Sequence, residues 1–126
     1  MAQRTKRSFR PARFLLLAAV LASACGGYAG AGGSSAAAPG ATVIPWQVGA
    51  TGVHTTVAAG TTVQWRSTDG MTHTVTSSST PSAFAELAVP GGGYSSPMTF
   101  TTPGTFPYFC SIHGARVQNG TLTVTP

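Results

Sequence analysis

Short runs in which apolar and polar residues alternate recur along residues 41–126, and they predict β-strands. The alternation is clearest at residues 61–65 and 121–125, where the apolar side chains fall at every second position and share one face of a strand. Further runs, bounded mostly by Gly, Pro, Ser or Asp, lie at residues 42–44, 54–57, 73–76, 98–101 and 106–109.

No helical period is convincing in this part of the chain, and residues 84–89 are expected to form a short helical turn or an irregular crossover. Many short alternating strands separated by turn residues are typical of two sheets packed face to face. The sequence therefore predicts an all-β fold, a Greek-key antiparallel β-sandwich.

The first 24 residues have the order of an export signal. Five of the seven Lys and Arg residues precede an apolar run at residues 14–21, and small residues follow it. The apolar run is too short to span a membrane stably. We therefore predict an export signal at residues 1–24 and a protein located in the periplasm or on the outer face of the cytoplasmic membrane.

Cys25 stands where a lipoprotein signal places its lipidated cysteine, although Leu21 lies four residues before it and the usual pattern has three. Lipid attachment at Cys25 is the favoured interpretation, and cleavage by an ordinary signal peptidase is the alternative. Residues 25–40 are rich in Gly, Ala and Ser and predict a flexible tether, which leaves residues 41–126 as the folded domain.

Removal of the signal changes the electrostatic picture. Arg66 and Arg116 then balance Asp69 and Glu86, so the formal charge of the remaining chain is zero. A neutral surface gives no reason to expect nucleic-acid binding, and it favours docking of partners through apolar contact. Two isolated acids are also too few for chemistry by paired carboxylates.

Cys110 is a thiol without an evident disulfide partner, because a lipidated Cys25 cannot pair with it. His113 follows three residues later, and His73 lies on an earlier predicted strand. One thiolate and two imidazoles form the ligand set of blue-copper sites. A nucleophilic pair of Cys110 and His113 is the enzymatic alternative, but it lacks an orienting acid and leaves His73 unexplained, so no enzyme is predicted.

Two stretches carry a family resemblance. The sequence YFCSIHGARVQNG at residues 108–120, followed by TLTV, resembles the ligand loop of the cupredoxins in their plastocyanin- and pseudoazurin-like branch. AAGTTVQW followed by DGMTHTV resembles the strand and first histidine of the same family. The resemblance implies one type 1 copper ion bound by His73, Cys110 and His113, with the Thr74 N–H bonded to the cysteine sulfur and the Thr74 hydroxyl joining the two ligand loops.

The fourth ligand departs from the family pattern. In plastocyanin-like loops the axial methionine lies five residues after the second histidine and two before the closing glycine, and both counts lead to Gln118. A shorter loop, as in amicyanin-like proteins, would place Arg116 there, but an arginine stays protonated and cannot ligate. Met71 and Met98 are assigned to packing. An amide oxygen is an accepted axial donor, so Gln118 is the predicted fourth ligand.

The resemblance implies a monomeric carrier of single electrons between redox partners such as cytochromes, oxidases or reductases. Two alternatives remain open from the residues: a module that stores or delivers copper, and a tethered β-sandwich that binds a partner without a metal.

Overall fold

The computed structural model describes residues 32–126, which contain eight β-strands and no helix long enough to cross a membrane. The predicted export signal, Cys25 and the first part of the predicted tether lie outside these residues. The strands are β1 (Thr42–Trp46), β2 (Val53–Ala58), β3 (Thr61–Ser67), β4 (His73–Ser77), β5 (Leu87–Val89), β6 (Met98–Phe100), β7 (Gly104–Phe109) and β8 (Asn119–Thr125).

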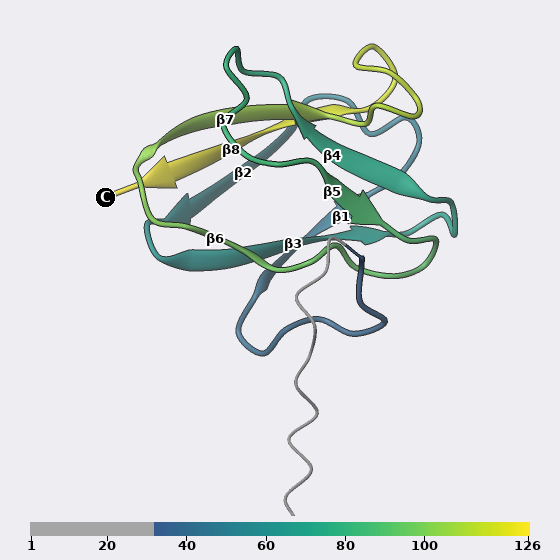
Figure 1. Ribbon diagram of the computed structural model, residues 1–126, viewed down its shortest axis with the longest axis horizontal. Coiled ribbons are helices and arrows are strands. Elements are labelled where there is room, and N and C mark those ends of the chain that lie inside the picture. Colours follow the sequence, from purple (N-terminus) through teal and green to yellow (C-terminus); the bar gives the residue numbers. More distant parts are fainter. Residues whose placement is uncertain (1–31) are drawn as a thin grey trace, which may run out of the picture.

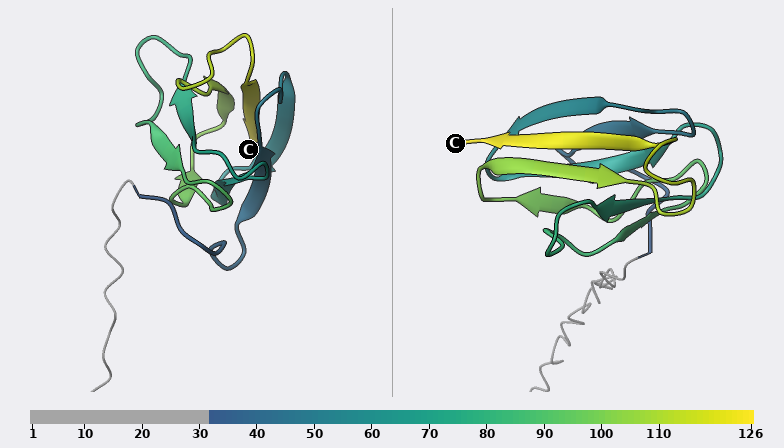
Figure 2. Two further views of the ribbon diagram at one scale, coloured as in Figure 1. Left: turned by 90° about the vertical axis from the view of Figure 1, so that its right-hand side faces the viewer. Right: turned by 90° about the horizontal axis from the view of Figure 1, so that it is seen from above.

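The strands form two sheets that pack face to face, as Figures 1 and 2 show. One sheet has the order β1-β3-β6, and the other has the order β2-β8-β7-β4-β5. The predicted Greek-key β-sandwich is confirmed, but the strands are not all antiparallel as expected. Both sheets are mixed, because β1 runs parallel to β3 and β2 runs parallel to β8, whereas the remaining pairs are antiparallel.

Strand β5 was not predicted. The sequence suggested a helical turn or a crossover at residues 84–89, but Leu87 to Val89 pair with β4. Leu87 and Val89 are buried while Ala88 between them is exposed, so this short segment has the alternation of a strand. Three residues are too few for that period to stand out in the sequence, and the pairing with β4 decides the structure.

The core lies between the sheets and is built around three aromatic side chains. Trp46, Trp65 and Tyr108 are at most 1% exposed, and the Tyr108 ring centroid lies 5.2 Å from that of each tryptophan. The apolar residues predicted to share a face on β3 and β8 are all buried in this core. Burial of large aromatic and aliphatic side chains is the main stabilising contribution in a domain of this size.

Part of the predicted tether contacts the domain. Ser34 and Tyr94 exchange two backbone hydrogen bonds of 2.8 Å, and the Ala38 N–H donates to the side chain of Gln64. Gln64 is fully buried on β3, and its amide also donates to the Ser95 carbonyl. Residues 32–40 therefore cover one edge of the fold and satisfy a buried amide.

Candidate metal centre

Three loops meet at one end of the sandwich, on the right in Figure 1, and they surround the predicted metal ligands. The loops are residues 47–52, 68–72 and 110–118, which lie between consecutive strands of the fold. His73 is the first residue of β4, and Cys110 directly follows β7. Because each side chain stands at the end of a paired strand, its backbone is held by a sheet on one side.

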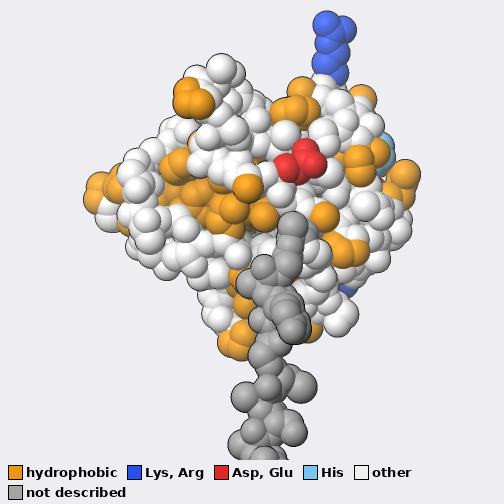
Figure 3. All heavy atoms as spheres, in the orientation of Figure 1, with side chains coloured by type: hydrophobic (Ala, Val, Ile, Leu, Met, Phe, Trp, Pro, Cys, Tyr) orange, Lys and Arg blue, Asp and Glu red, His pale blue; other side chains and the backbone are white. Residues whose placement is uncertain are grey.

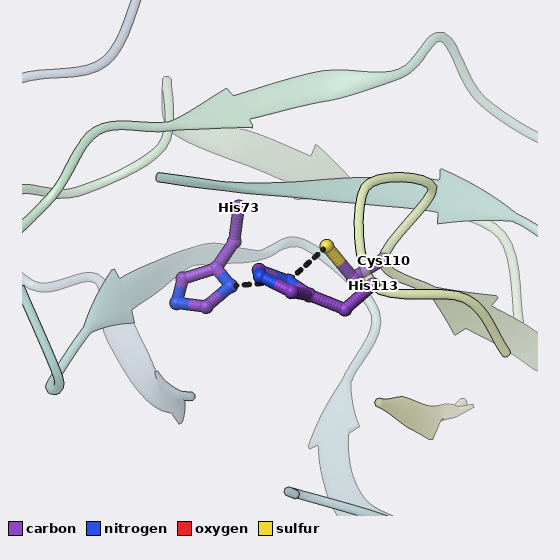
Figure 4. Close-up of side chains that lie close together, drawn as sticks. All are labelled: His73, Cys110 and His113. Atoms are coloured by element: carbon purple, nitrogen blue, oxygen red, sulfur yellow. Dashed lines mark hydrogen bonds between the residues drawn. The ribbon is translucent and has the colours of Figure 1, made fainter. Parts of the chain in front are cut away.

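The side chains of His73, Cys110 and His113 point toward one another (Figure 4). The Sγ atom of Cys110 lies 3.3 Å from Nδ1 of His113, which lies 3.3 Å from Nδ1 of His73. One ligand atom from each residue falls within 4.8 Å of the others. The structure thus brings together residues that are 37 positions apart in the sequence, at a separation that suits ligation of one ion.

Asp69 supports His73 from the side opposite the cluster. Its Oδ1 lies 2.8 Å from Nε2 of His73, and its two oxygens also accept the backbone N–H groups of Val48 and Met71. A carboxylate only accepts, so Nε2 of His73 carries the proton and Nδ1 keeps its lone pair for a metal. Carboxylate–histidine–metal arrangements of this kind fix the ligand's tautomer and orientation.

Burial opposes ionisation of Asp69, but the hydrogen bonds from Val48, His73 and Met71 outweigh burial and lower the pKa of its carboxyl well below the usual range. The sequence alone gives Asp69 no role at the site. The only indication in the sequence is that Asp69 lies four residues before His73. That spacing leads to a contact only because the loop between them brings the carboxylate to the imidazole.

Cys110 is fully buried, and its sulfur accepts the Thr74 N–H at 3.4 Å, as the family resemblance implied. Burial opposes ionisation of the thiol, but hydrogen bonds from the backbone of Thr74 and His113 and from the His113 imidazole outweigh it and lower the thiol pKa to about 6. The thiolate is the form that ligates metals. At neutral pH the thiol is therefore mostly ionised, in the form that binds a metal ion.

The loop after Cys110 is closed by its own backbone. The Gly114 N–H donates to the Cys110 carbonyl, and the Gly114 carbonyl accepts the N–H groups of Val117 and Gln118. Gly114 has a φ of 87°, a left-handed conformation that glycine adopts without steric cost. The Cys110 N–H in turn donates to the Gln118 carbonyl at 3.1 Å, so both ends of the loop are held together.

Gln118 and Arg116 differ sharply in their surroundings. Arg116 is exposed, whereas Gln118 is 0% exposed and neither its Oε1 nor its Nε2 has a hydrogen-bond partner among residues 32–126. A buried amide left without partners costs about 1–3 kcal/mol for each unpaired group. The longer of the two loop alignments agrees with this burial, because it is Gln118 and not Arg116 that turns inward.

The donor set fits copper. A buried thiolate, two imidazoles and a buried amide oxygen without a hydrogen-bond donor are the donor types of type 1 copper sites, in which three strong ligands are joined by a weak axial one. Thiolate favours Cu(I), and imidazole suits both oxidation states.

Comparison with known proteins agrees with this chemistry. Copper-binding proteins of the plastocyanin/azurin family match residues 52–125, more than half of the chain. No curated protein sequence matches the chain.

Similar solved structures include three amicyanins. A reduced tryptophan-to-tyrosine variant is 23% identical over 76% of this chain and 94% of that chain, with a TM-score of 0.59. Amicyanin from Paracoccus versutus (Thiobacillus versutus) is 19% identical over 76% of this chain and 93% of that chain, with a TM-score of 0.61. A methionine-to-glutamine variant of amicyanin with Cu(I) is 26% identical over 70% of this chain and 85% of that chain, with a TM-score of 0.54.

The family match, the shared β-sandwich and the convergence of a cysteine with two histidines all lead to one conclusion. The chain belongs to the plastocyanin/azurin family of copper-binding proteins, the cupredoxins, and its cofactor is copper.

Proposed function

We propose that the protein is a carrier of single electrons with one type 1 copper site, held by His73, Cys110 and His113 with Gln118 as the axial ligand. The observation that carries this proposal is the convergence of one thiolate and two imidazoles within 4.8 Å in a largely buried site. Bound copper supplies the chemistry by changing between Cu(II) and Cu(I). The protein must hold the ligands in place, set the reduction potential and provide a surface for redox partners.

The first requirement is that the ligands keep one geometry in both oxidation states. His73 is held by Asp69, and the cysteine loop is closed on itself and joined to β4 through the Ser111 N–H, which donates to the Thr74 hydroxyl at 2.7 Å. The hydroxyl bridge expected from the family resemblance is thus present. Ligands that are positioned in advance move little when the electron arrives, which keeps the barrier to transfer low.

Gln118 is proposed as the axial ligand because its burial is otherwise unexplained. The amide is buried like a core residue, but neither of its polar atoms has a hydrogen-bond partner in the described part of the chain. Ligation by Oε1 would satisfy the acceptor. An amide oxygen is a harder donor than the thioether sulfur of methionine, so it favours Cu(II) and lowers the reduction potential.

The surface around the site suits apolar docking of a redox partner. Among residues 32–126, five large hydrophobic side chains are exposed, and four of them stand in the three loops at the metal end: Val48, Met71, Ile112 and Val117. The expected packing role of Met71 is wrong, because its side chain is 48% exposed. Figure 3 shows apolar side chains at the right-hand end of the molecule and only isolated charges. We infer transient contacts between a monomer and its partners.

An enzymatic role is less well supported. The sulfur of Cys110 is fully buried and cannot reach a substrate without opening the loop, and its neighbour His113 faces His73 and not an acid. A nucleophilic pair needs an accessible sulfur. We therefore infer that the protein transfers electrons without transforming a substrate.

We also propose that residues 1–24 direct export and that Cys25 carries a lipid, with residues 25–40 holding the domain near the outer face of the cytoplasmic membrane. The order of basic, apolar and small residues supports this proposal. Mass spectrometry of the membrane fraction tests it, because a lipidated N-terminus at Cys25 has a characteristic added mass. A soluble chain that begins at another residue would contradict it.

The function is tested by adding Cu(II) to the purified protein. We expect an intense blue absorption from thiolate to copper, binding of one ion per chain, and reversible reduction by one electron. The Cys110→Ser variant is the matched control and should lose the absorption. Binding without this band or without reversible reduction would favour copper storage or delivery, and no binding would favour a β-sandwich that only docks a partner.

A further inference from the structure

A carboxylate outside the ligand set is connected to the cysteine sulfur by hydroxyl groups. Oε2 of Glu86, just before β5, lies 2.5 Å from Oγ1 of Thr76 and 3.0 Å from Oγ of Ser111. Both hydroxyls also contact Oγ1 of Thr74, at 3.1 Å and 2.9 Å. Oγ1 of Thr74 in turn lies 3.8 Å from Sγ of Cys110. Glu86 thus joins three elements: β4, the segment before β5 and the ligand loop.

The number of protons in this cluster determines the direction of its hydrogen bonds. Each hydroxyl has one proton, and an ionised carboxylate can only accept. The protons of Thr76 and Ser111 therefore point to Glu86. In the contact between Thr74 and Ser111, the only proton left to donate is that of Thr74.

The same proton is the one that could reach the sulfur. Oγ of Ser111 is 2.9 Å from Oγ1 of Thr74, and Sγ of Cys110 is 3.8 Å away, so the oxygen is the better acceptor. While Glu86 accepts from Ser111 and Thr76, the Thr74 hydroxyl donates to one of these two oxygens, of which Ser111 is the nearer. The sulfur then keeps only the Thr74 N–H as its donor from β4. Without the carboxylate, the Ser111 and Thr76 hydroxyls can both turn to donate to Thr74. The Thr74 proton then has the sulfur as its remaining acceptor within the cluster.

We propose that Glu86 is a positioning residue for the cysteine thiolate: through Thr76 and Ser111 it turns the Thr74 hydroxyl proton away from Sγ of Cys110. This inference rests on the proposed electron-transfer function. Hydrogen bonds to the sulfur withdraw negative charge from it and make it a weaker donor to Cu(II), which raises the reduction potential. By removing one such bond, Glu86 lowers the potential, in the same direction as an amide axial ligand.

Two substitutions separate the hydroxyl network from a simple effect of charge. Glu86→Gln removes the negative charge but keeps a carbonyl oxygen that can accept from both hydroxyls, whereas Glu86→Ala removes the acceptor as well. We expect the potential of the copper-loaded Glu86→Ala variant to rise and its thiolate-to-copper absorption to move to shorter wavelength. Glu86→Gln should remain close to the parent protein in both measurements.

Equal upward shifts in the two variants would overturn the proposal, because charge alone would then account for the effect. Unchanged potentials in both variants, even with a lower melting temperature for Glu86→Ala, would also overturn it and leave Glu86 as a loop clamp. The Ser111→Ala substitution completes a double-mutant cycle. In that background Glu86→Ala should shift the reduction potential less than it does in the parent protein, because the Ser111 hydroxyl that links Glu86 to Thr74 is absent.

Proton NMR of the full metal-free protein measures the hydroxyl direction itself. We expect the Thr74 hydroxyl proton to show proximity to the Ser111 side chain in the parent and Glu86→Gln proteins, and to Cys110 in Glu86→Ala. The same proximity in all three would overturn the proposal. If the parent protein shows no blue absorption with copper, the proposed function fails, and this measurement alone decides whether Glu86 orients the hydroxyl.

Discussion

The thiol of Cys110 should make the metal-free protein more stable as the pH rises. Its pKa is lowered from 9.0 to about 6 by hydrogen bonds from Thr74 and His113, which outweigh the opposing effect of burial. A shift of about 3 units, at ~1.36 kcal/mol per unit, corresponds to at most ~4 kcal/mol of folding free energy. The stabilisation is fully present above pH 9, where the thiol is ionised in both states, and is lost as the pH falls through 6.

Chemical denaturation of the metal-free, reduced protein at a series of pH values measures this effect, with Cys110→Ser as the matched control. The difference in unfolding free energy between the two proteins should rise by about 1.4 kcal/mol per pH unit between the native and unfolded pKa values and level off outside that window. For a domain of this size, ~1 kcal/mol moves the melting temperature by about 4–8 °C. Ultraviolet absorption of the thiolate gives the native pKa independently.

A difference that does not vary with pH would show that Thr74 and His113 do not stabilise the thiolate. A difference that falls with rising pH would show that burial is the stronger influence on the thiol. Either result would refute the view that the fold presents a thiolate to the metal at neutral pH.

Substitutions at three other positions test the axial ligand, the support of His73 and the closing glycine of the motif. Gln118→Met should raise the reduction potential, because a thioether is softer than an amide oxygen; voltammetry showing an unchanged or lower potential would contradict axial ligation. Asp69→Asn should weaken copper binding by about 10–100-fold, because an amide cannot accept all of the hydrogen bonds made by the carboxylate; competition with a chelator measures this, and parent-like affinity would count against the role of Asp69. Gly120→Ala should lower the unfolding free energy by about 1–3 kcal/mol, because its Cβ would lie 2.5 Å from the Tyr108 ring. Thermal unfolding at the parent temperature would argue against that contact.

Local patterns were sufficient to predict most strands and the cysteine–histidine pair. Alternation with period two on β3 and β8 reflects burial of one face, and that requirement acts on each strand separately. Cys110 and His113 are three positions apart within one closed turn, so their proximity follows from the chain itself. The counts that led to Gln118 depend on the same short loop, and they agree with the burial of its side chain.

Other features depend on residues that are far apart in the sequence. The parallel pairing of β1 with β3 and of β2 with β8 is set by the crossing connections of the sandwich. Strand β5 forms because β4 offers an edge to Leu87 and Val89. No local sequence pattern shows which strands will pair, and three residues are too few to show the alternation that predicts a strand.

By itself, the sequence determined the β-sandwich and the approach of Cys110 to His113, because strand alternation and a short turn are local properties of the chain. Gln118 was singled out by the family resemblance of its loop, and its ligation stays a prediction. Only the tertiary structure decided that Asp69 supports His73 and that Glu86 bonds to the Thr76 and Ser111 hydroxyls beside Thr74. The physical reason is that a hydrogen bond needs two groups within about 3 Å, and for Glu86 that proximity arises only when β4, the segment before β5 and the ligand loop pack together.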